Sequence, residues 1–217
     1  MDTRKPAPQG AGRAILPTAL AVLFGGSTAH AVSISEIFYD AVGRDADHTF
    51  IELVGRPGES LDGLILVGVN GSNGEDYLRI PLSGILPDTG VYLIADGSAG
   101  HSSVPGAQRY TDADLQNGPD SLQLRRGGHV LDAVGYGDFT DARFAGIGTP
   151  APDAPPGKSL TRIAWTGDNG HDFVVTDPSP GIAVPAPVPV PAALWLFGSG
   201  LGVLGLRARG RTPTPGT

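Results

Sequence analysis

The chain has 217 residues, of which 33 are glycine and 20 are proline, and it contains no cysteine. This length accommodates one ordinary domain with flanking segments, and the lack of cysteine excludes disulfide bonds and thiolate chemistry. Between Val32 and Ala183 there are 21 acidic and 9 basic residues, a net charge of −12, which disfavours binding to nucleic-acid phosphates.

The first 31 residues have the three parts of a secretory signal peptide in the required order. The cationic part contains Arg4, Lys5 and Arg13. An apolar stretch over 14–24 follows, and Ala29 and Ala31 occupy the small-residue positions of a cleavage site. A helix of this stretch would be about 17 Å long, too short to cross a membrane. We therefore expect cleavage after Ala31.

Short apolar runs separated by turn-forming clusters dominate the middle of the chain, where no window of eleven residues has sustained helical periodicity. Nine of these runs are typical of β-strands. They cover residues 32–39, 49–54, 63–69, 77–82, 91–95, 121–125, 130–136, 159–165 and 172–176. Many short strands and turns predict an all-β fold, an antiparallel β-sandwich of immunoglobulin-like type.

Alternation, one proline and a pair of glycines predict local features of individual strands and turns. Leu78, Ile80 and Leu82 alternate with more polar neighbours, so they are expected to share the buried face of one strand. Pro81 in the same run has no N–H group and is expected on an edge strand. The glycine pair within 126–129 predicts a tight hairpin.

Two longer stretches, 95–117 and 139–158, are rich in Gly, Pro, Ala and Asp and are expected to be exposed loops. Aspartates in or near the loops form two groups whose oxygens could serve as Ca²⁺ ligands. The groups are Asp40, Asp45 and Asp47, and Asp112, Asp114 and Asp120. Neither group has the spacing of an EF-hand. No cofactor is therefore predicted, with Ca²⁺ kept as the alternative.

No catalytic residue is predicted. The histidines beyond the signal peptide lie in turn-like settings, and no serine has the context of an activated nucleophile. These histidines are His48, His101, His129 and His171. Glu36 and Glu52 are unusual because each is a carboxylate inside an apolar strand, where burial is costly without partners. We expect them to be structural; alternatively, they face solvent or pair with Arg162.

The C-terminal part resembles a membrane segment with a spacer. Residues 178–191 are dense in proline, which favours extended geometry. Residues 188–206 carry no charge and would form a helix about 28 Å long, just enough to span a bilayer. Arg207, Arg209 and Arg211 follow, on the side expected to remain cytoplasmic.

The order Pro189-Val190-Pro191, apolar run, arginine cluster resembles the bacterial PEP-CTERM sorting signal. Val190 stands where the commonest form has Glu. The resemblance implies that an exosortase-type peptidase of the inner membrane removes the helix and releases the protein to the cell surface or matrix. A permanent single-pass anchor is the alternative, because hydrophobic length does not separate the two.

The middle of the chain resembles the lamin tail domain of secreted bacterial proteins. The resemblance rests on "ISEIFYD", "HTFIELVG", "LQNGPDSLQLRRGGHVLDAVGYG" and "DFVVTDPSPG", in that order, and covers about residues 32–183. It implies an immunoglobulin-like β-sandwich that acts as a noncatalytic adhesive or targeting module. Glu36 and Glu52 occupy characteristic positions of this family.

Together these features predict an ordered set of segments. A signal peptide (1–31) precedes the domain (32–183), a Pro-rich linker (184–191), the sorting and transmembrane segment (192–211) and a disordered tail (212–217). The expected partners are an exosortase-type peptidase, the inner membrane, and a matrix polysaccharide or surface protein. A membrane-anchored binding protein and a Ca²⁺-dependent hydrolase are the alternatives.

Overall fold

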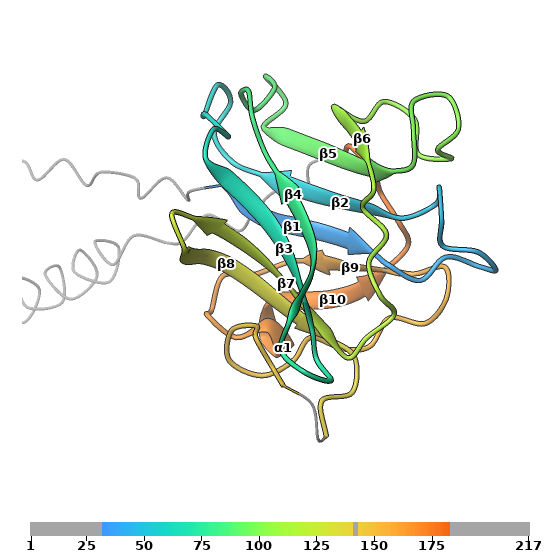
Figure 1. The fold of residues 1–217 in the computed structure, drawn as a ribbon, viewed down its shortest axis with the longest axis vertical. Helices are drawn as coiled ribbons and strands as arrows, with labels where there is room; N and C mark the ends of the chain where they lie inside the picture. The colour runs from blue at the N-terminus through green and yellow to red at the C-terminus, as the bar shows by residue number, and fades with distance from the viewer. Residues whose placement is uncertain (1–31, 141–142, 183–217) are drawn as a thin grey trace, which may run out of the picture. The chain divides into compact units, whose positions relative to one another are not determined.

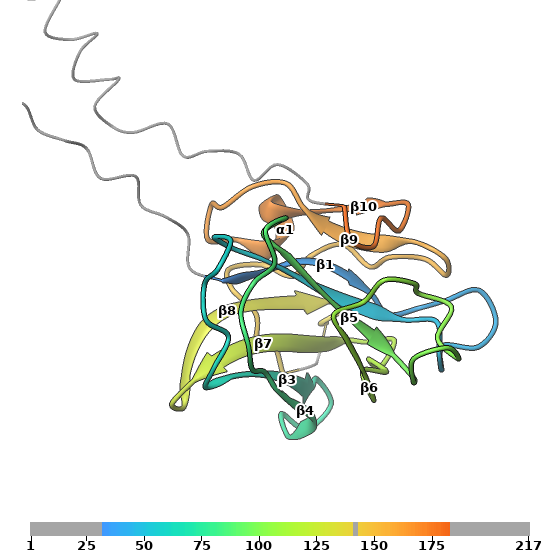
Figure 2. The same ribbon diagram turned by 90° about the horizontal axis from the view of Figure 1, so that it is seen from above.

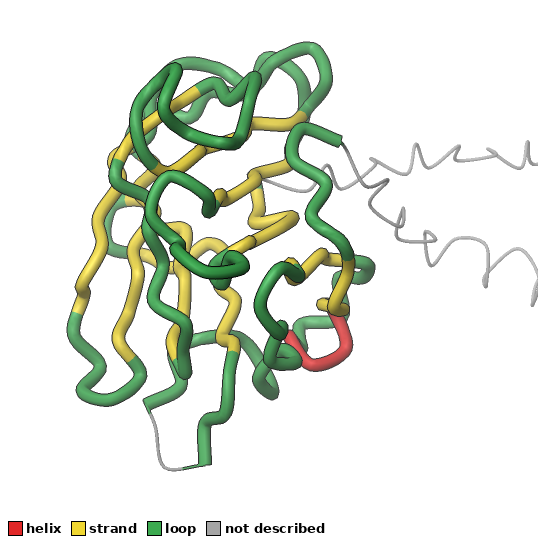
Figure 3. Tube along the Cα trace, turned by 90° about the vertical axis from the view of Figure 1, so that its right-hand side faces the viewer, coloured by secondary structure: helices red, strands yellow, loops and turns green. Residues whose placement is uncertain are grey.

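The computed structural model describes residues 32–140 and 143–182, which form ten β-strands and one short helix (Figure 1). The first five strands are β1 (Ser33–Phe38), β2 (Phe50–Val54), β3 (Leu64–Asn70), β4 (Asp76–Pro81) and β5 (Val91–Asp96). The next four are β6 (Arg109–Thr111), β7 (Asp120–Arg126), β8 (His129–Tyr136) and β9 (Ser159–Arg162). Helix α1 (Asn169–Asp172), red in Figure 3, and β10 (Phe173–Thr176) follow.

The strands form two sheets that pack face to face as a β-sandwich, seen as separate layers in Figure 2. One sheet has the order β10-β9-β1-β2-β5-β6, and the other has the order β4-β3-β7-β8. Neighbouring strands run antiparallel except for β5 and β6, which are parallel. The predicted all-β, predominantly antiparallel architecture is therefore confirmed for the described residues.

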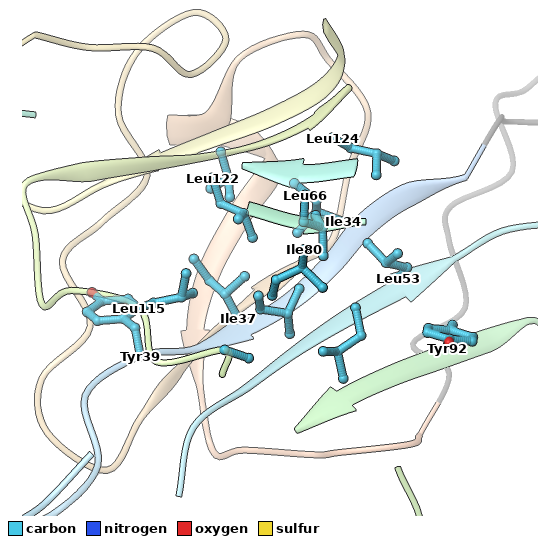
Figure 4. Close-up of a cluster of buried hydrophobic side chains, with 14 of the residues drawn as sticks. Ile34, Ile37, Tyr39, Leu53, Leu66, Ile80, Tyr92, Leu115, Leu122 and Leu124 are labelled. Carbon is cyan, nitrogen blue, oxygen red and sulfur yellow. The ribbon is translucent and has the colours of Figure 1, made fainter. Parts of the chain in front are cut away.

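The hydrophobic core lies between the two sheets (Figure 4). Ile37 and Leu53 of the six-stranded sheet belong to the same buried cluster as Leu66 and Leu122 of the other sheet. All four side chains have no measurable solvent exposure. Burying each aliphatic side chain of this kind contributes about 1.5–3 kcal/mol, so this interface is the main source of stability.

Each of the nine predicted strands exists, and three local predictions are confirmed. Pro81 ends β4, an edge strand, where its missing N–H removes no ladder hydrogen bond. Gly127 and Gly128 have φ angles of 55° and 85° and connect β7 to β8, as a tight hairpin requires. Leu78, Ile80 and Leu82 are all buried.

Three details of the prediction were wrong. The stretch 95–117 contains β6, a three-residue strand too short to show a periodicity of two in the sequence. The strand predicted over 159–165 ends at Arg162. The strand predicted from residue 172 starts at Phe173, because a one-turn helix precedes it and its N-cap Asp168 accepts a hydrogen bond from the Gly170 N–H at 3.1 Å.

A β-bulge in β1 decides which of its side chains enter the core. Ile34 pairs with Leu53 and Glu36 pairs with Glu52, so Ser35 is an extra residue with no opposite partner. Ile34 and Ile37 can therefore both point into the core although they are three residues apart. Glu36 lies on the opposite face of the sheet.

Several predicted segments lie outside the described residues. These are the signal peptide with Ala29 and Ala31, the Pro-rich linker, and the sorting segment with Pro189, Val190, Pro191, Arg207, Arg209 and Arg211. Within residues 32–140 and 143–182, no helix has the length and apolarity needed to cross a bilayer.

Candidate functional site

Glu36 and Glu52 are cross-strand partners on the face of the six-stranded sheet that points away from the core. Neither residue has measurable solvent exposure. The alternative that they face solvent is therefore wrong, as is the alternative that they pair with Arg162, which binds Asp132 and Asp172 instead. Like charges directly opposite each other destabilise a sheet, so this pair needs compensating donors.

The donors to Glu36 come mainly from residues 177–182, which follow β10 and which we call the strap. The Ser179 N–H donates to Glu36 Oε1 at 2.9 Å, and the Ser179 hydroxyl donates to Oε2 at 2.6 Å. The Ser159 hydroxyl on β9 donates to Oε1 at 2.6 Å. Three hydrogen bonds thus replace the water that Glu36 loses on burial.

Glu52 is held by two donors. The Gly181 N–H of the strap donates to Oε2 at 2.9 Å, and the hydroxyl of the bulged Ser35 donates to Oε1 at 3.0 Å. Among the described residues neither glutamate forms an ion pair. The two carboxylates therefore fix the last described segment of the chain across the sheet without a neutralising cation.

Burial raises the pKa of the Glu52 carboxyl to about 7, and the neighbouring Glu36 adds to this rise. The hydrogen bonds from Gly181 and Ser35 act in the opposite direction. An acid whose pKa is higher in the folded than in the unfolded chain binds more protons when folded. Between pH 4.5 and about 7, Glu52 therefore makes folding less favourable as pH rises.

The raised pKa of Glu52 leads to a prediction for Glu52→Gln. Glutamine keeps the shape of the side chain but cannot ionise. Relative to the wild type, the variant is expected to become more stable between pH 5 and pH 8, by roughly 1–3 kcal/mol. The difference in free energy of unfolding between the variant and the wild type should increase as the pH rises through 7 and then become constant. Urea unfolding of both proteins at a series of pH values measures this difference.

The matched control is Glu75→Gln, because Glu75 is an exposed glutamate in the turn between β3 and β4. Because this side chain is exposed, the substitution should change the free energy of unfolding by no more than about 0.5 kcal/mol at each pH. If Glu52→Gln and Glu75→Gln gave parallel pH profiles, Glu52 would ionise like an exposed carboxyl and the strap would not shield it.

Arg162 is the centre of a second buried polar group, which joins the two sheets. Its Nη2 atom donates to both carboxylate oxygens of Asp132 on β8, each at 2.8 Å, and its Nε atom donates to the Ile34 carbonyl at 2.8 Å. Asp172 lies on the other side, 3.5 Å from Nη1. The guanidinium group packs on Trp165, 4.0 Å from the ring centre. This arrangement is a structural cross-link.

The aspartates proposed as Ca²⁺ ligands are only partly brought together. Asp45 accepts from the Ala41 N–H at 2.7 Å and from the Asn117 side chain at 3.2 Å. Burial raises the pKa of Asp114, and Asp96 and Asp45 raise it further, so these carboxylates are neighbours.

Of the remaining proposed ligands, Asp47 and Asp120 interact with groups outside the two sets of aspartates. Asp47 pairs with Arg44 at 3.1 Å, and Asp120 accepts from the Gly71 N–H at 2.7 Å. Burial raises the pKa of Asp40, and Asp45 raises it further. No hydrogen bond or ion pair of the Asp112 side chain is found within residues 32–140 and 143–182. No group of three or more His, Asp or Glu side chains in this part of the chain is arranged to hold a metal ion.

One serine–histidine contact was not predicted. The Ser103 hydroxyl lies 2.8 Å from His48 Nδ1, and both residues are exposed. An activated nucleophile also needs a third group that orients the base, and no described carboxylate contacts this imidazole. The two residues are 55 positions apart in the sequence, so no local pattern indicates the contact.

No protein-family model matches the chain, and a search of the curated proteins finds no significant match.

Proposed function

We propose that this chain is an exported, noncatalytic protein with a lamin-tail-type, immunoglobulin-like β-sandwich. An exosortase-type peptidase delivers it to the cell surface or the extracellular matrix. There it serves as an interaction module that binds a matrix polysaccharide or a surface protein. The tripartite order of each flanking segment supports the delivery route.

The observation that carries the proposal is that the two buried glutamates accept hydrogen bonds from the protein's own strands and strap. Glu36 and Glu52 occupy positions that the resemblance marks as characteristic, and such carboxylates are the usual candidates for acid–base catalysis. Their oxygens accept hydrogen bonds from Ser35, Ser159 and the strap. They are covered by the chain, so their geometry supports a structural role in which the strap closes one face of the sandwich.

Mass spectrometry of the protein from fractions of its native cells tests the delivery route. The expected product starts at Val32 and lacks the apolar run and the arginine cluster. A Pro189→Ala, Pro191→Ala double variant should keep its C-terminal segment and accumulate in the membrane fraction. A wild-type protein that keeps its intact tail in membranes would instead indicate a permanent anchor, and an uncleaved leader would contradict export.

A further inference from the structure

A polar cleft with a volume of about 560 Å³ lies at one end of the four-stranded sheet. It is bordered by the turn after β3, the segment that leads into β7 and the segment that follows β8. The side chains that line it belong to Asn70, Ser72, Gln116, Asp120, Asp138 and Thr140. Its volume lies in the range of small-molecule sites, about 300–1,000 Å³.

Glycines let the backbone segments around the cleft approach one another closely. A Cβ atom at Gly71 would overlap the Pro119 carbonyl group. Gly137 has a φ of 89°, and a Cβ atom there would lie 2.9 Å from Pro119 Cα. Side chains cannot be added at these positions without moving the backbone, so the cleft depends on glycine at both positions.

The inner wall of the cleft presents polar atoms that have no hydrogen-bond partner within the described residues. Asp120 is 3% exposed, and its Oδ1 accepts the Gly71 N–H at 2.7 Å. Gln116 Oε1 accepts from Asn70 Nδ2 at 2.9 Å, which fixes the amide plane. Within the described part of the chain, Asp120 Oδ2 and Gln116 Nε2 have no hydrogen-bond partner. An acceptor on the buried Asp120 and a donor on the exposed Gln116 thus remain for a ligand.

The outer wall of the cleft also presents polar atoms that have no hydrogen-bond partner among the described residues. Asp138 Oδ1 accepts from the backbone N–H of Thr140 at 3.1 Å and from its hydroxyl at 2.9 Å. Asp138 Oδ2 has no protein partner among the described residues. The Ser72 hydroxyl donates to Asn70 Oδ1 at 2.5 Å, which leaves its oxygen lone pairs as acceptors.

The types of side chain that line the cleft indicate which class of ligand it can bind. Among the described residues no Lys, Arg or His lines it, so these residues offer no positive charge to phosphate, sulfate or uronic-acid groups. Its carboxylates, carboxamides and hydroxyls are the partners that alcohol groups need, since each alcohol both donates and accepts a hydrogen bond. Polar groups fixed before binding also lower the entropy cost of holding a flexible ligand.

We propose that this cleft binds an uncharged, polyhydroxylated ligand, namely a neutral oligosaccharide. Asp120 and Asp138 accept hydrogen bonds from sugar hydroxyls, and Gln116 Nε2 donates one. That the glycan belongs to the cell surface or matrix rests on the proposed function, whereas the binding chemistry rests on the cleft alone.

Calorimetric titration of the full chain tests the proposal, in a detergent without sugar headgroups. The uncharged probes are cellohexaose, maltohexaose, laminarihexaose, mannohexaose and chitohexaose, and a heparin hexasaccharide is the anionic probe. At least one uncharged probe should bind with a Kd of about 1 mM or lower. Gln116→Ala and Asp138→Ala should each weaken this binding about tenfold or more.

Asp88→Ala is the matched control, because it removes the same charge from an exposed turn before β5. It should bind the probe as the wild type does, and circular dichroism should show that all variants are folded. The proposal is overturned if no uncharged probe binds, if the heparin probe binds more tightly, or if the two cleft variants bind normally. Failure of glycan binding leaves the processed termini unchanged, so it is distinguishable from failure of the proposed delivery route.

Discussion

Replacing Arg162 with methionine is expected to lower the free energy of unfolding by about 3–5 kcal/mol. The side chain has a relative exposure of 4%, and its removal leaves the buried carboxylate of Asp132 without its cation. It also removes the hydrogen bond to the Ile34 carbonyl and the packing on Trp165. Guanidinium chloride unfolding of the full chain measures the loss.

Arg79→Met is the matched control for this experiment. Arg79 pairs with Asp76 at 2.6 Å, but its side chain is 56% exposed. Exposed ion pairs contribute about 0–1 kcal/mol because water and salt screen them. If the two substitutions had equal effects, the cross-link between the sheets would contribute no more than a surface ion pair.

Replacing Glu36 with alanine is expected to detach the strap and to lower the stability of the domain by about 2–4 kcal/mol. Both hydrogen bonds from Ser179 are lost, and the Ser159 hydroxyl loses an acceptor beneath the strap. The Ser179 amide should therefore exchange with solvent at least about tenfold faster. Hydrogen exchange followed by mass spectrometry of peptides from 177–182 measures this rate.

Glu75→Ala is the control, since it removes an exposed glutamate whose side chain, among the described residues, accepts a hydrogen bond only from Asn73, at 3.2 Å. Its strap amides should exchange at the wild-type rate. Wild-type exchange in Glu36→Ala would show that other contacts hold the strap, and that the buried glutamate pair is not its anchor.

Much of the sandwich follows from local sequence patterns. The alternation of apolar and polar residues predicted which face of β4 is buried, since successive side chains of a strand point to opposite faces. Pro81 and the pair Gly127–Gly128 marked an edge and a hairpin through the backbone geometry of these residue types alone. These features depend on a few neighbouring residues.

The bulge at Ser35 shows where local patterns fail. Strict alternation would place Ile34 and Glu36 on one face of β1 and Ile37 on the other. The extra residue reverses the alternation, so both isoleucines enter the core and Glu36 points beneath the strap. No glycine or proline marks this position, so the bulge is not visible in the local sequence.

The sequence by itself determined the nine principal strands, their turns and the acidic charge of the middle region, because these depend on residue type and short-range spacing. Only the tertiary structure decided which side chains meet. Glu36 and Ser179 are 143 residues apart, and Arg162 and Ile34 are 128 apart. Such pairs depend on strand order and register, which arise when the two sheets bury their apolar faces together. The same long-range packing formed the polar cleft from three separate segments.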